Sequence, residues 1–65
     1  MNDYQYATIR AHTDEELVAR LRNNWDLYHA DRKIAARARA AAETLKWIRA
    51  LEEEMARRGI PLPLP

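Results

Sequence analysis

The hydrophobic pattern of the chain centres on the segment from Asp31 to Gly59. Apolar residues recur there at spacings of four and three, at Ile34, Ala38, Ala41, Leu45, Ile48 and Met55. This spacing places them on one face of an α-helix, which we predict over residues 31–58. Trp47 and Leu51 fall on a second apolar strip beside that face. A helix with two apolar faces needs two partners.

A first helix is predicted over residues 13–29. Its start is marked by Thr13-Asp-Glu-Glu16, in which the Thr13 hydroxyl can accept from the Glu16 amide while the Glu16 side chain returns to the Thr13 amide. Apolar residues then follow on one face, at Leu17, Val18, Leu21, Trp25 and Tyr28. This pattern is typical of an amphipathic helix that packs on a neighbour.

The position of the turn between the two helices rests on phase, because no glycine or proline lies between Asp14 and Arg58. The first stripe, if extended, reaches the polar Asp31 or Arg32, whereas the second begins at Ile34 with a different phase. We therefore predict a turn at residues 29–31, with Asp31 as the N-cap of the second helix. A connection this short makes an antiparallel hairpin. The alternative, one long helix in a coiled-coil dimer, is disfavoured by polar Asn24 and Asp31 at seam positions.

The two ends of the chain differ from the hairpin in pattern. Residues 1–12 alternate, with Tyr4, Tyr6, Thr8 and Arg10 on one side, which favours an extended arm. Gly59 followed by Ile60-Pro61 predicts a Schellman stop in which Ile60 touches Met55. Pairs from Glu53 to Arg57 and from Glu54 to Arg58 support the last turns. Residues 60–65 form a Pro-rich tail that we expect to be extended.

The size of the chain predicts association. At 65 residues without cysteine, it has a small core and no disulfide or thiolate metal site to stabilise it. We therefore expect an all-α fold in which two hairpins dimerise into a four-helix assembly. Seven residues are assigned to the core or the dimer interface: Leu17, Leu21, Trp25, Ile34, Leu45, Ile48 and Met55.

The charge of the chain bears on its partners. A net charge of +1 is far from the strongly basic composition of proteins held mainly by phosphate contacts, so nucleic acid is a less favoured partner. No apolar run reaches membrane-spanning length and no secretion signal is evident, so we expect a cytoplasmic protein that does not bind membranes. Residues 32–50 are locally basic and could dock acidic groups.

Catalysis finds little support in the sequence. Asp26 and His29 are one helical turn apart, yet a surface pair of this kind is far more often solvated than catalytic or metal-binding. We therefore predict no enzyme activity, cofactor or metal. Partner binding is instead assigned to the tyrosines of the arm, the junction between the two helices and the spare apolar and basic face of the second helix: Tyr4, Tyr6, Tyr28, Arg32, Arg37, Trp47 and Leu51. Replacement of Trp47 or Tyr28 by alanine should weaken partner binding or dimerisation by about 2 kcal/mol.

Three classes of function fit these features. The first is a small dimeric inhibitor that binds a larger host protein and occludes its surface. The second is a DNA-binding regulator of ribbon-helix-helix type, in which paired arms would read bases through Tyr4, Tyr6, Thr8 and Arg10, or through Gln5. It departs from that family because the turn lacks glycine and the second helix is too long. The third is a structural helical adaptor. We favour the first.

The layout of the chain as a whole also carries a resemblance. The Thr13-Asp-Glu-Glu-Leu17 start, the Arg- and Ala-rich hairpin and the Arg57-Arg58-Gly59-Ile60 stop resemble short early proteins encoded by bacteriophages of GC-rich hosts. Among these the chain is similar to the quorum-sensing anti-activators of Pseudomonas phages, small helical proteins that inhibit a LuxR-type regulator and also the pilus assembly ATPase. The resemblance implies occlusion of host proteins, and it transfers no site residues.

Overall fold

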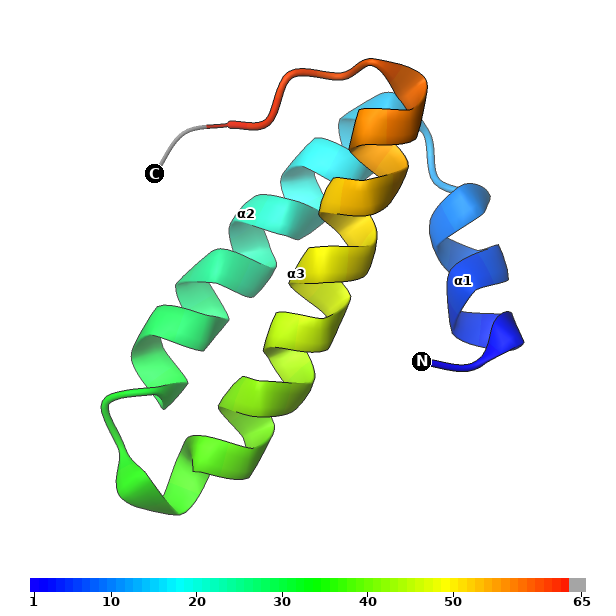
Figure 1. Cartoon of the computed structure of the whole chain (residues 1–65). Helices are drawn as coiled ribbons and strands as arrows, with labels where there is room; N and C mark the ends of the chain where they lie inside the picture. Colours follow the sequence, from blue (N-terminus) through cyan, green and yellow to red (C-terminus); the bar gives the residue numbers. More distant parts are fainter. Residues whose placement is uncertain (64–65) are drawn as a thin grey trace.

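Three α-helices and one short 3₁₀ turn make up the fold. A computed structural model describes residues 1–63, with α1 at Asp3–Arg10, α2 at Asp14–Asp31, the 3₁₀ turn η1 at Ala35–Arg37 and α3 at Ala38–Arg58. The long helices α2 and α3 form an antiparallel hairpin, and α1 lies beside the second half of α3 (Figure 1). The prediction of an all-α fold built on a hairpin is therefore confirmed.

Both outer ends of the hairpin follow the sequence signals. The Thr13 hydroxyl accepts from the Glu16 amide at 3.1 Å, and the Thr13 amide donates to the Glu16 carboxylate at 2.8 Å. At the other end, Gly59 adopts φ 73°, a left-handed conformation that glycine reaches without a Cβ clash. The Ile60 amide then donates to the Met55 carbonyl at 2.9 Å, which is the Schellman bond.

The turn lies three residues later than predicted. α2 continues through residues 29–31, and the chain reverses at residues 32–34 before η1. Nothing in His29-Ala30-Asp31 interrupts a helix, whereas Ile34 is extended at φ −118° and ψ 114°. Asp31 is therefore not an N-cap but the last residue of α2, where its buried carboxylate accepts from Arg37 Nε at 3.2 Å. α3 therefore begins seven residues later than the predicted helix over 31–58, because Asp31 belongs to α2, residues 32–34 to the turn and residues 35–37 to η1.

The N-terminal segment is a helix and not an extended arm. Asn2 caps α1 by accepting from the Gln5 amide at 2.9 Å, and Gln5 returns by accepting from the Asn2 amide at 3.0 Å. This reciprocal pair is a capping box of the same kind as the one at Thr13. Ile9 is 1% exposed, so α1 is fixed to the hairpin by a buried side chain. The prediction of an arm over residues 1–12 was wrong.

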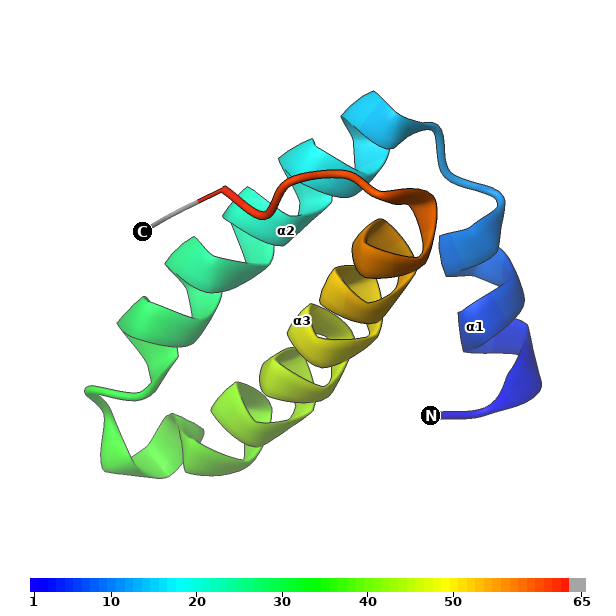
Figure 2. The same cartoon turned by 45° about the horizontal axis from the view of Figure 1, so that its top comes forward.

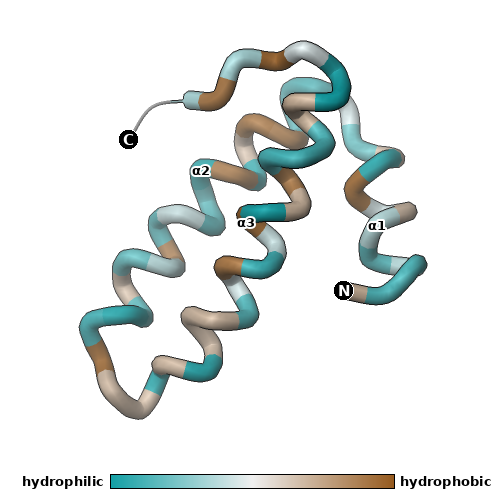
Figure 3. The backbone as a smooth tube through the Cα atoms, viewed as in Figure 1, coloured by the Kyte–Doolittle hydropathy of each residue, from teal (hydrophilic) through white to brown (hydrophobic). Residues whose placement is uncertain are grey.

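The core lies between α2 and α3. Its central residues are Leu17 and Leu21 of α2 with Ile48, Leu51 and Met55 of α3, each at most 1% exposed. Four of the seven residues assigned to the core or dimer are confirmed as core, while Trp25 and Leu45 are half-buried against it. Figure 3 shows the apolar positions recurring along the paired helices.

Two assignments change with the phase of α3. The buried stripe runs through Ala41, Thr44, Ile48, Leu51 and Met55, between the two strips that the sequence suggested. Leu51 is therefore a core residue at 0% exposure, and the assignment of its side chain to partner contact is corrected. Ile34 is not a core residue, because it lies in the turn and is 53% exposed. Its place in a dimer interface stays a prediction.

The helix α3 has two partners within the same chain. It lies between α2 and α1 in both views of the fold (Figures 1 and 2), and Ile9 and Ala50 join the same core cluster. The expectation of two partners for this helix is thus met in part by α1. The tail leaves α3 toward α2 over residues 60–63, while Leu64 and Pro65 lie outside the described residues. Over residues 1–63, each helix is too short or too polar to pass through a bilayer.

Candidate interaction surface

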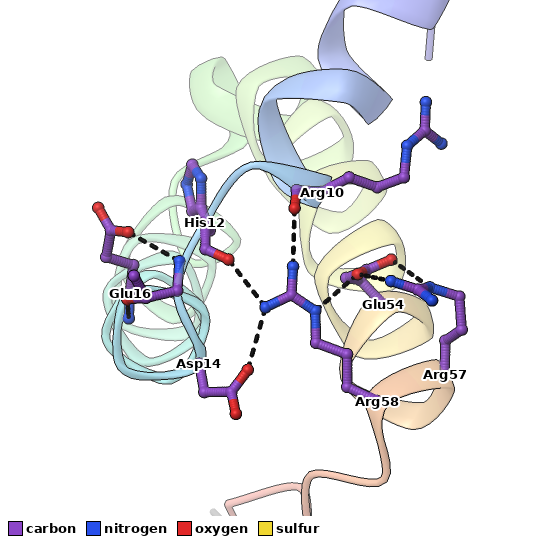
Figure 4. A network of polar contacts seen from close by, with 8 residues as sticks. Arg10, His12, Asp14, Glu16, Glu54, Arg57 and Arg58 are labelled. Atoms are coloured by element: carbon purple, nitrogen blue, oxygen red, sulfur yellow. Dashed lines mark hydrogen bonds and ion pairs between the residues drawn. The ribbon is translucent and has the colours of Figure 1, made fainter.

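A single arginine joins the linker after α1 to the end of α3. Arg58 donates to the backbone carbonyls of Arg10 and His12, each at 2.8 Å, and to Asp14 Oδ1 at 3.0 Å. Its Nε also donates to Glu54 at 2.7 Å, so one guanidinium connects α3 to the segment between α1 and α2 (Figure 4). The planar fork of arginine suits this arrangement. Arg58 therefore fixes where α1 lies relative to α3.

Glu54 is the buried counter-charge of this arrangement. Its carboxylate accepts from Arg57 Nε at 2.9 Å and from Arg58, with the side chain 7% exposed. The hydrogen bonds from Arg57, together with those from Arg58, lower the pKa of Glu54 to about 2, although burial opposes this shift. The predicted pair from Glu54 to Arg58 is confirmed, whereas Arg57 pairs with Glu54 and not with Glu53.

Three aromatic rings of α2 pack on one another near the turn. Trp25 and His29 stack with centroids 5.5 Å apart and an interplanar angle of 22°, and Tyr28 meets Trp25 edge-on at 5.7 Å. Trp25 and Tyr28 also pack against the core, while His29 is exposed. The His29 ring thus packs on the Trp25 ring at the surface of α2. The ring cluster gives one surface of the hairpin an aromatic centre.

A second tryptophan marks the opposite surface of the hairpin. The Arg20 guanidinium carbon lies 5.6 Å from the centre of the Trp47 ring, a cation–π contact between α2 and α3. Trp47 is half-buried against the core. Leu27 follows Arg20 by seven residues on α2, so it projects on the same side, and it is 48% exposed.

The residues predicted to bind a partner are spread over three places. Tyr4 and Tyr6 lie on α1 with exposed fractions of 80% and 37%, and Arg32 and Arg37 lie exposed at the turn. Tyr28 and Trp47 are half-buried on the hairpin. They do not form one continuous patch. A ribbon-helix-helix protein needs a β-strand in its N-terminal arm. Here the residues of that arm form α1, and residues 1–63 contain no β-strand.

Several surface features escaped the sequence interpretation. The capping box at Asn2 and Gln5 could have been recognised from its spacing, which matches the pattern of the second box. The contacts of Arg58 with the carbonyls of Arg10 and His12 span more than 40 residues, and no local pattern announces them. Arg22 was not singled out as a binding residue, although it is exposed, whereas Arg49 lies within the basic residues 32–50 that the sequence suggested as a docking surface.

The hollows on the described part of the chain include one of about 400 Å³ along the first half of α2, which is open to solvent. The hollow between α1 and α3 has a volume of about 240 Å³ and is lined by Tyr6, Ile9, Arg10, Ala50, Glu53, Glu54 and Arg57. Residues 1–63 contain no group of three or more acidic or histidine side chains placed to hold a metal ion. The prominent features of this surface are its exposed apolar and charged side chains.

Comparison with known proteins adds no assignment to this surface. No protein-family model, no curated protein and no solved structure matches the chain. What the chain binds therefore has to follow from the side chains on its own surface. Those side chains include large apolar groups on α1, on α2 and at the turn.

Proposed function

We propose that this protein is a non-enzymatic protein-binding module that covers a surface of a larger protein and acts as a homodimer. One observation carries the proposal: large apolar and aromatic side chains remain at the surface although the hairpin core is closed. They are Tyr4 at 80% exposure, Ile34 at 53%, Leu27 at 48%, Leu62 at 45%, Met1 at 38% and Tyr6 at 37%. Exposed apolar groups mark interaction sites where several lie together. Met1, Tyr4 and Tyr6 lie within the first six residues, and Leu27 and Ile34 lie near the hairpin turn.

Occlusion is the mode of action that fits such a surface. Binding through exposed apolar and aromatic groups needs an area of roughly 800 Å² per partner for a stable complex, about one sixth of the 4784 Å² exposed by this chain. A bound partner would therefore be masked over an area comparable to one side of the hairpin. The resemblance to phage anti-activators suggests a bacterial regulator of LuxR type or a pilus assembly ATPase as the target.

Capture of the target tests this proposal. Immobilised wild-type protein is expected to retain a specific host protein, identified by mass spectrometry and then confirmed with the purified partner. The double variant Leu27→Ser/Ile34→Ser should lose at least part of this binding, because both side chains are exposed, outside the core and available to the dimer through which the protein is proposed to act. The matched control Ala30→Ser changes an exposed residue near the same turn and should bind normally. Wild-type protein that retains no purified candidate at micromolar concentration would contradict the proposal.

A further inference from the structure

We propose that one surface of the hairpin, the aromatic–basic face, docks an amphipathic helix of a partner protein whose apolar residues are flanked by Asp or Glu. This face consists of Arg22, Trp25 and His29 on α2, Arg32 directly after its end, and Leu45 and Arg49 on α3. The proposal rests on the protein-binding function proposed above and adds the surface and the chemistry of the partner.

The spacing on α2 defines one half of the face. Arg22, Trp25, His29 and Arg32 follow one another at intervals of three, four and three residues, so they form a single stripe. The stacking of Trp25 on His29 shows that these neighbours do lie together. The stripe runs beside the buried stripe of Leu17 and Leu21. Trp25 thus sits at the border between core and solvent.

The helix α3 supplies the other half. Leu45 and Arg49 are four residues apart, and both flank the core residue Ile48 on the side away from Trp47. α2 and α3 are antiparallel and face each other through their core stripes. Residues that are rotated from these two stripes by a similar angle in the same direction, each followed from the N- to the C-terminus of its helix, therefore lie on the same surface of the hairpin. The contact between Arg20 and Trp47 shows this for the opposite surface. Trp25 and Leu45 therefore lie on one surface, separated by the core from Trp47.

This face is not covered by α1. α1 contacts the other side of α3, where Tyr6 and Ile9 share a hollow with Ala50 and Arg57. In Figures 1 and 2 the lower half of the hairpin, toward the turn, has no helix over it. The side chains of Trp25 and Tyr28 are only half-buried, so a part of each ring is exposed to solvent.

Charge selects the partner. Arg22, Arg32 and Arg49 are exposed, and none of them forms an ion pair within the described part of the chain. Acidic residues border the face as well, because Asp26 follows Arg22 by four residues on α2. On α3, Glu52 and Glu53 follow Arg49 by three and four residues. An acidic partner would gain three charge contacts around an aromatic centre. A second copy of this chain is disfavoured here, since a twofold axis would place arginines against arginines.

The shape of the face suits a helix. From Arg22 to Arg32 the stripe extends about 15 Å along α2, the length of roughly three helical turns. A helix laid along this face would place apolar residues at i, i+3, i+4 and i+7 on Trp25 and Leu45. Nucleic acid is a weaker fit, because the Trp25 ring packs on the core and on His29 and does not present a free stacking face.

Two synthetic peptides test the proposal. One is an amphipathic helix of about 16 residues with leucines on one side and glutamates beside them, and the other replaces every glutamate by lysine. In a Trp47→Phe background, Trp25 is the sole tryptophan and reports binding by its emission. The glutamate peptide is expected to shift the Trp25 emission to shorter wavelength and to bind at least about tenfold more tightly than the lysine peptide.

Charge reversal on the face provides the matched comparison. Arg22→Glu/Arg49→Glu should weaken binding of the glutamate peptide by about tenfold or more, whereas Arg39→Glu, at an exposed position on the outer side of α3, should change it less than about twofold. The proposal would be overturned if both peptides bound equally or if neither bound. It would also be overturned if the peptide changed the emission of Trp47 in the Trp25→Phe variant but left that of Trp25 unchanged in the Trp47→Phe variant. Displacement of the peptide by single-stranded oligonucleotide that itself binds more tightly would overturn it as well. A captured host protein whose binding ignores Arg22 and Arg49 would keep the protein-binding function and reject only this face.

Discussion

At the scale of the residue, Glu54 links the charge state of the chain to its stability. Its side chain is 7% exposed and is held by hydrogen bonds from Arg57 and Arg58. Because those bonds favour the charged form, the pKa of Glu54 in the folded state is about 2, below the ordinary 4.5. The folded state thus binds this proton less readily than the unfolded state does.

This difference predicts the direction of a pH effect. The stabilising contribution of Glu54 should be complete above pH 4.5 and decline as the pH falls from 4.5 toward about 2. Glu54→Gln should lower the free energy of unfolding at neutral pH by on the order of 2 kcal/mol and flatten its decline in acid. Urea denaturation at a series of pH values measures the free energy of unfolding at neutral pH and its decline in acid. Glu53→Gln, an exposed neighbour, is the control, and equal acid profiles for the two variants would contradict the assignment.

At the scale of the element, the position of α1 depends on Arg58 and Ile9. Arg58→Lys keeps the positive charge but loses the fork that reaches two carbonyls and two carboxylates. We expect a loss of about 2 to 3 kcal/mol in the free energy of unfolding, with faster hydrogen exchange of the α1 amides than of the α2 amides. Arg57→Lys is the control, because Arg57 is 65% exposed and bonds to Glu54 alone. Unchanged exchange in α1 for Arg58→Lys would show that the fork does not hold this helix.

The elements also show what the sequence could predict. The hairpin, the Thr13 start and the Gly59 stop follow from local chemistry, since capping and left-handed glycine need only neighbouring residues. The position of the turn did not follow, because Asp31 has the composition of an N-cap but is buried and paired with Arg37 six residues later. α1 was missed because the alternation of Tyr4 and Tyr6 outweighed the capping pair at Asn2 and Gln5.

The candidate site was predictable to a smaller extent than the fold. Tyr4, Arg32 and Arg37 are exposed as expected of binding residues, whereas Leu51 is in the core. A rotation of α3 about its own axis by a few tens of degrees decides whether Leu45 or Leu51 lies at the centre of the core. This rotation depends on how α2 packs against α3. Which arginines remain free for a partner likewise depends on contacts between distant segments.

At the scale of the whole molecule, the two surfaces of the hairpin suit different partners. The side that carries Arg20 and Trp47 also presents Leu27 at 48% exposure, and its apolar groups can meet their own copies across a twofold axis. The aromatic–basic face opposes such pairing by charge. A homodimer through the Trp47 side would therefore leave both aromatic–basic faces free, so that one dimer could engage two partner helices.

Sedimentation tests this division of surfaces. Wild-type protein at tens of micromolar is expected to sediment at about twice the chain mass of 7.6 kDa and to dissociate on dilution. Trp47→Ala should raise the dimer dissociation constant by a factor of about 30, the equivalent of 2 kcal/mol at a central aromatic contact. Arg49→Glu should leave it unchanged, because Arg49 lies on the other surface. A folded species of single-chain mass at every concentration would exclude the dimer. A dimer that is disrupted by Arg49→Glu and not by Trp47→Ala would instead place the twofold axis on the aromatic–basic face. That face would then have no room for a partner helix.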